Sequence, residues 1–309
     1  MESVRPACRP NRGAPKLTAL PLTKGRLPES ESAAAEDAAR SLVRDKDHSA
    51  PSIFLPEALL REARRQKRLH DHDVPAVCLL DPDGDIVRRL KRTGAARSHA
   101  GWACYHTELF AFDLEGYGEV GVVGCVVGAS FAVLVAEQLF ASGCRLLVSM
   151  TSAGAIAQDA SAASRFVLIE RALRDEGTSP HYLPPAPFAD APDPDLLAEV
   201  EKALRGEISI AATIRRGATW TTDAPFRETR SAIEAARVSG VLAVEMEAAA
   251  LYAFAKARGK AIVCFAHVTN SMGQVEGDFE KGEADGVTAS LCVVATTART
   301  WATKKDLQT

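Results

Sequence analysis

The sequence lacks the features that are typical of extracellular proteins, of proteins stabilised by a structural metal ion and of membrane proteins. Aromatic residues make up only 6% of the 309 residues, and the seven cysteines include no C-x-x-C pair. Irregularly spaced cysteines favour buried free thiols in a reducing compartment, here the cytoplasm, over a disulfide framework or a zinc site. The longest apolar stretch, residues 120–136, is interrupted by three glycines and a serine. It is therefore typical of a strand, a turn and a helix rather than a membrane span.

No charge of one sign dominates the chain either. The 37 Lys and Arg residues nearly balance the 40 Asp and Glu residues, which leaves a net charge of −3. Such a balance gives no strong field toward nucleic acid or anionic lipid, so a small molecule is the expected partner. The hydrophobic fraction of 47% is ordinary for a globular protein and excludes a wholly disordered or collagen-like chain.

The first 50 residues differ in composition from the remainder. Residues 1–28 mix basic residues with Pro and Gly, and the next segment, ESESAAAEDAAR, is acidic. Neither part has an apolar stripe that could pack, so we expect a disordered arm at 1–50 and a single domain at 51–309. The basic start leaves an organelle transit peptide as an alternative.

From Pro51 onward, short apolar runs alternate with helix-like stretches. The runs typical of strands are 74–80, 120–127, 145–150, 165–170, 208–214 and 261–268, and the helix-like stretches are 55–68, 131–142, 195–205, 227–238, 245–258 and 284–299. Apolar strands separated by helices predict an α/β domain of three layers, with helices on both faces of a mostly parallel sheet. In such folds the ligand lies beyond the carboxyl ends of the strands.

Two patterns at these strand ends have ordinary explanations beside functional ones. Residues 79–90, LLDPDGDIVRRL, place three aspartates around a glycine, but their spacing does not fit a calcium loop, and a tight turn is favoured. Residues 128–132, GASFA, resemble a nucleophile elbow around Ser130. With Asp223 and His267 downstream, a serine α/β-hydrolase is an alternative, although no HGG-type oxyanion segment precedes the serine.

The strongest local signal is VEMEAAALYAFA, residues 244–255. It predicts a helix that ends at Gly259 and carries Glu245 and Glu247 in its first turn. Carboxylates there are favoured by the helix dipole alone. A single carboxylate can also accept hydrogen bonds from two adjacent ribose hydroxyls while Met246 packs against the sugar. The pattern therefore indicates a sugar site as well as a helix start.

This segment and several others together resemble the nucleoside phosphorylase superfamily, particularly its uridine phosphorylase-like branch. The other motifs are VVGAS, SAGAI, GTSPHYLPP and TTDAPFRE, in the family's order, and the resemblance covers about residues 51–300. It implies a single three-layer α/β domain in a homo-oligomer, a hexamer or a dimer. It also implies reversible cleavage of a nucleoside by phosphate, as co-substrate, to free base and pentose 1-phosphate, without a metal or organic cofactor.

The resemblance also implies roles for individual residues. Glu247 is expected to hold the ribose 2′ and 3′ hydroxyls, with Met246 lining the sugar pocket. Ser152 corresponds to a hydroxyl that contacts phosphate and sugar, and Gly154 follows it in the same loop. The segment RSHAGW resembles a stretch whose arginine reaches phosphate in the neighbouring subunit, which nominates Arg97.

The base site is less clearly encoded. Thr229 and Ser231 stand where uridine phosphorylases have their uracil-reading residues, with Arg230 one position away. His181 lies in the loop 177–194, a possible lid. Purine-cleaving relatives protonate the leaving base with an aspartate, and the matching residue here is Asn270. Because Asn cannot deliver a proton, a pyrimidine nucleoside is the expected substrate.

The chain departs from the family at the phosphate site. Where the family has Gly-Asp-Pro followed by an arginine, this chain has residues 80–84, LDPDG, and the family's second arginine corresponds to Ser149. Each lost arginine removes a strong charge-assisted contact to phosphate unless Arg88 or Arg89 replaces it. The sequence thus favours a phosphorylase by motif order and leaves a nucleosidase that uses water, or a non-catalytic nucleoside-binding relative, as alternatives.

Overall fold

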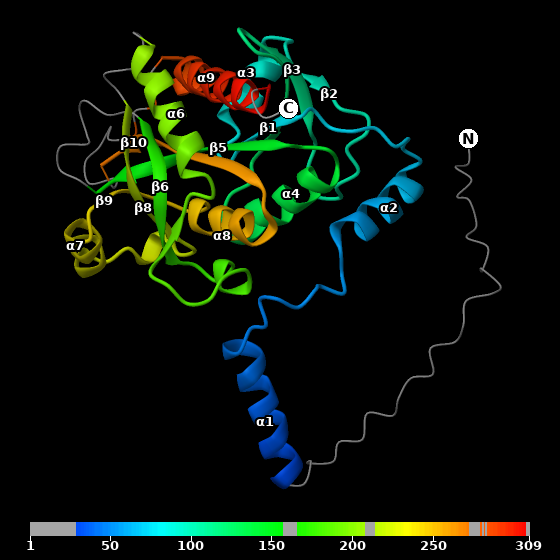
Figure 1. The fold of residues 1–309 in the computed structure, drawn as a ribbon, viewed down its shortest axis with the longest axis vertical. Coiled ribbons are helices and arrows are strands. Elements are labelled where there is room, and N and C mark those ends of the chain that lie inside the picture. Colours follow the sequence, from blue (N-terminus) through cyan, green and yellow to red (C-terminus); the bar gives the residue numbers. More distant parts are fainter. Residues whose placement is uncertain are drawn as a thin grey trace, which may run out of the picture. The chain divides into compact units, whose positions relative to one another are not determined.

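The computed structural model describes residues 29–156, 166–207, 214–271, 279, 281 and 283–306 (Figure 1). The chain divides into two units, Met1–Lys46 and Asp47–Thr309. The first contains a helix, α1 (Glu29–Arg44), within the segment that the composition predicts to be a disordered arm. The arm's first 28 residues lie outside the described part. In the described part no helix has both the length and the apolar character that crossing a bilayer requires.

The second unit is built around one sheet of ten described strands. They are β1 (Val77–Asp81), β2 (Arg97–Ser98), β3 (Phe110–Leu114), β4 (Gly118–Gly124), β5 (Leu146–Ala155), β6 (Phe166–Asp175), β7 (Phe188–Asp190), β8 (Ile214–Thr222), β9 (Val241–Glu245) and β10 (Ala261–Asn270). Their order is β10-β6-β8-β9-β5-β1-β4-β3-β2, with β7 on β6. Because β10 also pairs with β5, the strands β5, β9, β8, β6 and β10 close into a ring.

The prediction of a mostly parallel sheet is wrong, because the sheet is mixed. Strand β1 is parallel to β4 and β5, but β3 is antiparallel to β4 and β9 is antiparallel to β5. Apolar runs indicate that a strand is buried and do not reveal its direction. The sequence did not predict β3 and β9, which supply these antiparallel pairs. Most of the expected strand 208–214 lies outside the described residues.

The predicted helices from residue 55 onward are present. They are α2 (Pro56–Lys67), α4 (Ala129–Ala141), α6 (Pro194–Gly206), α7 (Arg230–Val238), α8 (Ala248–Arg258) and α9 (Val287–Asp306). The additional helix α3 (Asp85–Arg92) and the short 3-10 helix η1 (Ser179–His181) were not expected. The 3-10 helices η3 (Pro225–Arg227) and η4 (Glu283–Gly286) overlap the starts of the expected helices 227–238 and 284–299. In Figure 1, α6 and α9 pack together on one side of the sheet, and α4 and α8 pack together on the other.

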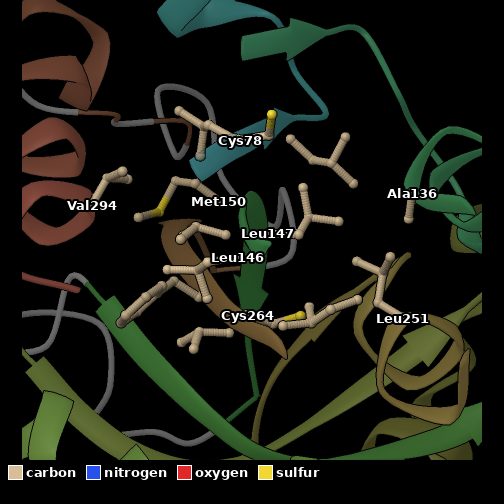
Figure 2. Packing of buried hydrophobic residues seen from close by; sticks show 14 of the residues in the cluster. Cys78, Ala136, Leu146, Leu147, Met150, Leu251, Cys264 and Val294 are labelled. Atoms are coloured by element: carbon tan, nitrogen blue, oxygen red, sulfur yellow. The ribbon is translucent and has the colours of Figure 1, made fainter. Parts of the chain in front are cut away.

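The core lies between these layers. Figure 2 shows Leu147 of β5 and Cys264 of β10 in the middle of the cluster. Val294 of α9 approaches from one side, and Ala136 of α4 and Leu251 of α8 approach from the other. All five side chains are buried. This packing fixes the strands whose ends carry the polar residues described next.

Candidate active site

A cavity of about 380 Å³ lies between the turn after β1, the end of β5, the segment after β8 and the ends of β9 and β10. Four residues predicted from the sequence line it: Ser152, Gly154, Met246 and Asn270. They come from three strand ends far apart in the chain. Their convergence makes this cavity the candidate active site.

The cavity is acidic. Among the described residues, its charged lining groups are the carboxylates Asp83, Glu228 and Glu245 and the ammonium group of Lys281. Lys281 bonds to Asp85, and its Nζ lies 3.7 Å from Oδ2 of Asp83. Ser152 donates a hydrogen bond to Asp83. The cation of the cavity is thus already paired with carboxylates.

Glu245 has a structural role that the sequence analysis did not foresee. It is the last residue of β9 rather than part of a helical turn, and it is 3% exposed. Its carboxylate accepts hydrogen bonds from the hydroxyls of Thr219 and Thr221, at 3.1 and 2.5 Å, and from the amides of Glu247 and Ala248, at 2.7 and 2.8 Å. It therefore joins β8 to β9 and satisfies free amides at the start of α8.

Glu247 precedes α8 and is 1% exposed. Its Oε1 accepts from the Gly128 amide at 2.7 Å, and its Oε2 accepts from the Thr151 hydroxyl at 2.8 Å. It does not itself line the cavity, although its chain neighbour Met246 and the neighbour of Thr151, Ser152, both do. Its carboxylate is thus held directly behind the cavity wall.

Burial raises the pKa of both glutamates. The pKa of Glu245 is raised mainly by its removal from water. The pKa of Glu247 is raised to about 8, first by burial and then by the negative charge of Glu245. Two neighbouring buried carboxylates disfavour full ionisation of the pair. Of the two, Glu245 lines the cavity, where a raised pKa is typical of a functional site.

The turn after β1 is the aspartate-rich segment that the sequence singled out. Asp81 is buried and accepts from the Val87 amide at 2.9 Å, so it fastens the turn to α3. Burial, together with the charges of Asp83 and Asp85, raises the pKa of Asp81 to about 7. Asp83 is held toward the cavity by the bond from Ser152.

The two positions at which the resembled family has phosphate-binding arginines are occupied here by Gly84 and Ser149, which carry no charge. Gly84 adopts a φ of +76°, and a Cβ at this position would lie 2.6 Å from Sγ of Cys125, so an arginine is excluded without rearrangement. Ser149 is buried in β5, and its hydroxyl has no hydrogen-bond partner among the described residues. Arg88 donates to Asp85 at 2.5 Å and lines a different cavity, together with Cys125.

The predicted base-site residues separate in the structure. Asn270 lines the cavity, whereas Thr229 and Arg230 are exposed at the start of α7 and do not. The Thr229 hydroxyl caps that helix by accepting from the Ala232 amide at 3.2 Å. Glu228, one residue earlier, lines the cavity and was missed. It is the last residue of the recognised motif TTDAPFRE, but base-reading residues were sought only after the motif.

Arg97 and His181 do not line the candidate active site of their own chain. Arg97 is exposed on β2, where its guanidinium pairs with Asp113 and Glu119 at 3.1 and 3.0 Å. His181 lines a separate cavity of about 580 Å³, together with Tyr182. The expected contribution of Arg97 to a neighbouring subunit stays a prediction.

The loop expected to be a lid is braced from within. The guanidinium of Arg174 donates to the Ser179 hydroxyl at 2.8 Å and to the carbonyl oxygens of Leu183 and Pro184 at 3.1 and 2.6 Å. Glu176 accepts from the amide of Ser179 at 2.8 Å. None of these residues lines the candidate site.

Asp223 and His267, two residues of the alternative serine hydrolase interpretation, make contacts of their own in the structure. Asp223 accepts from the Gly177 amide at 2.8 Å, and the ring of His267 stacks on Phe166 with centroids 4.8 Å apart. Ser130 is exposed in the first turn of α4. Within the described ranges, no group of three or more His, Cys, Asp or Glu side chains is placed to hold a metal ion.

Known structures of low sequence identity share this fold. Purine nucleoside phosphorylase from Toxoplasma gondii, solved with immucillin-H, has a TM-score of 0.63 at 16% identity over 77% of this chain and 95% of that one. Uridine phosphorylase from Vibrio fischeri has a TM-score of 0.61 at 21% identity, over 74% and 94% of the two chains. AMP nucleosidase from Bacteroides thetaiotaomicron has a TM-score of 0.61 at 17% identity, over 81% and 99%.

Sequence comparison is more specific about ancestry. No significant match was found among curated protein sequences. The family model described as the phosphorylase superfamily, however, matches residues 74–298, which include every strand of the sheet and every residue of the candidate site. The chain therefore belongs to the phosphorylase superfamily, whose members act on nucleosides.

Proposed function

We propose that the protein is a nucleosidase, which cleaves the N-glycosidic bond of a nucleoside with water and releases free pentose and base. The supporting observation is the charge of the cavity: among the described lining residues the one cation, Lys281, is already paired with Asp83 and Asp85, and Asp83 presents a carboxylate to the cavity. Carboxylates repel a phosphate dianion, and they stabilise the positive charge that develops on the sugar as the bond breaks. Water carries no charge and enters such a site without this penalty.

The proposed reaction is dissociative. As the bond between C1′ and the base lengthens, its electron pair leaves with the base and the sugar becomes an oxocarbenium ion. Water adds to C1′, and its proton passes to Asp83, which Ser152 and Lys281 orient. Met246 packs against the sugar, and we propose that Glu247 binds its hydroxyls. No metal or organic cofactor takes part in these steps.

Product analysis tests this proposal directly. Purified protein is incubated with purine and pyrimidine nucleosides and with AMP, each with and without inorganic phosphate. We expect free pentose in both conditions, at rates that do not depend on phosphate. If pentose 1-phosphate forms, and only when phosphate is present, the reaction is phosphorolysis and the proposed hydrolysis is wrong. The identity of the best substrate also tests the preference for pyrimidine nucleosides inferred from Asn270.

Phosphorolysis is the second candidate, because Lys281 places an ammonium group in the cavity and ammonium groups bind phosphate. Arg97 separates the two reactions. Its guanidinium is paired on the surface of its own chain, so Arg97→Ala should leave the rate of hydrolysis unchanged. A steep rise in the KM for phosphate at constant nucleoside KM would instead support phosphorolysis, with Arg97 donated by a neighbouring subunit of a homo-oligomer.

A further inference from the structure

The carboxylates of the cavity differ in how they are held. Glu245 accepts hydrogen bonds from four donors, and Asp83 is bonded to Ser152 and close to Lys281. Glu228 is half-buried, and its carboxyl group has neither a hydrogen bond nor an ion pair to any residue that the structure describes. A half-buried carboxyl group that serves no internal contact is available to a bound ligand.

Asp83 and Glu228 follow the two outer strands of a row of four in the sheet. Asp83 follows β1, Ser152 belongs to β5, Met246 follows β9, and Glu228 comes after β8. These four strands are consecutive neighbours in the sheet. A sugar bound at the middle two strands therefore has Asp83 on one flank and Glu228 on the other.

Glycosidic cleavage needs an acid as well as a base. The departing base takes the electron pair of the broken bond, and a proton supplied to it lowers the barrier. Asn270 lines the cavity but has no proton to give. The cavity therefore needs another donor if unactivated nucleosides are to be cleaved.

We infer that Glu228, in its protonated form, is the general acid that donates a proton to the leaving base. The inference rests on the proposed nucleosidase function. In the complete step the C1′–N bond breaks, the base gains the proton of Glu228, water adds to C1′, and Asp83 takes the proton of the water. Transfer of a proton from Asp83 to solvent, and from solvent to Glu228, restores the site.

The surroundings of Glu228 favour its acid form. Burial raises the pKa of Glu228 above its ordinary value. In the part of the lining that the structure describes, the other charged groups are Asp83, Glu245 and Lys281, and Lys281 is paired with carboxylates. The neighbouring Arg227 and Arg230 are exposed to solvent. The nearby carboxylates also disfavour a further negative charge at Glu228.

The test compares two leaving groups in Glu228→Gln. One substrate is the nucleoside that the wild type cleaves best, and the other is 4-nitrophenyl β-D-riboside, whose nitrophenolate departs without a proton. We expect kcat for the nucleoside to fall about 10²-fold or more, the usual contribution of a general acid, and kcat for the nitrophenyl riboside to remain unchanged. In the wild type, nucleoside cleavage should slow as the pH rises and Glu228 deprotonates. In Glu228→Gln this pH dependence should be absent.

Glu199→Gln is the matched control, because Glu199 is exposed on α6 and does not line the cavity. It should match the wild type in both activities, and both variants should melt at the wild-type temperature. Equal losses on the two substrates in Glu228→Gln, or no loss on either, would overturn the acid role while leaving the nucleosidase proposal standing. A wild type that hydrolyses neither substrate would refute both.

Discussion

Replacement of Glu247 by Gln is expected to lower kcat for nucleoside cleavage by at least about 10²-fold, the usual cost of removing one preorganised electrostatic group. The carboxylate is held by the Gly128 amide and the Thr151 hydroxyl, directly behind the cavity wall. We propose that the ribose hydroxyls become further donors to it when substrate binds. A neutral amide accepts fewer hydrogen bonds and cannot balance the charge of an oxocarbenium ion, so steady-state kinetics should show the loss mainly in kcat.

The Gln variant separates this effect from loss of the fold. Its amide oxygen can still accept from Gly128, and its amide nitrogen can donate to Thr151. Circular dichroism and thermal melting should therefore match those of the exposed control Glu199→Gln. Near-normal turnover by a folded Glu247→Gln protein would contradict the assignment of this residue to the sugar.

The raised pKa of Glu247 gives the same variant a signature in pH. In the unfolded chain this carboxyl group ionises near its ordinary pKa of 4.5, whereas in the fold it ionises near 8. The folded state therefore binds the extra proton between these values, and the contribution of this group to stability falls as the pH rises through this window. With 4-nitrophenyl β-D-riboside, whose leaving group needs no acid, activity that requires the Glu247 carboxylate should rise toward pH 8. Melting curves recorded across the window should show a smaller pH dependence for Glu247→Gln than for the wild type.

The sequence predicted the alternation of helices and strands better than the direction of the strands. Strands such as β5 and β10 have long buried apolar runs, which leave a clear signal. Strand β9 is short and runs directly into the segment before α8, so its last residue, Glu245, was assigned to the helix and the strand itself was not predicted. Its antiparallel pairing with β5 depends on contacts between distant parts of the chain, which local patterns do not encode.

Residues of the candidate site were predictable where they belong to a motif. Ser152, Met246 and Asn270 were found in this way, and all three line the cavity. Lys281 was missed because the segment around it has no periodicity and matches no motif. Asp83 lay in a recognised position, but it drew attention only as part of a motif that had lost its arginine. In the structure, the turn that lacks the family's arginine presents the carboxylate of Asp83 to the cavity instead.

This carboxylate leads to the second large effect, expected in Asp83→Asn. As the proposed general base, Asp83 contributes about 10²- to 10⁴-fold to the rate of hydrolysis, and an amide cannot accept the proton of water. The amide oxygen can still accept the hydrogen bond from Ser152, so the turn should keep its shape. We therefore expect a folded protein whose kcat for nucleoside hydrolysis falls by this factor while its KM changes little.

The matched control is Asp85→Asn, which removes the same charge from the same turn. Asp85 bonds to Lys281 and Arg88 but does not line the cavity, so its replacement should cost far less activity than that of Asp83. Formate, a small carboxylate, should restore part of the activity of Asp83→Ala, because it can occupy the vacated space and accept the proton. A purely structural residue would not be rescued in this way. Equal losses in Asp83→Asn and Asp85→Asn, without rescue by formate, would show that the turn acts only through its charge or its shape.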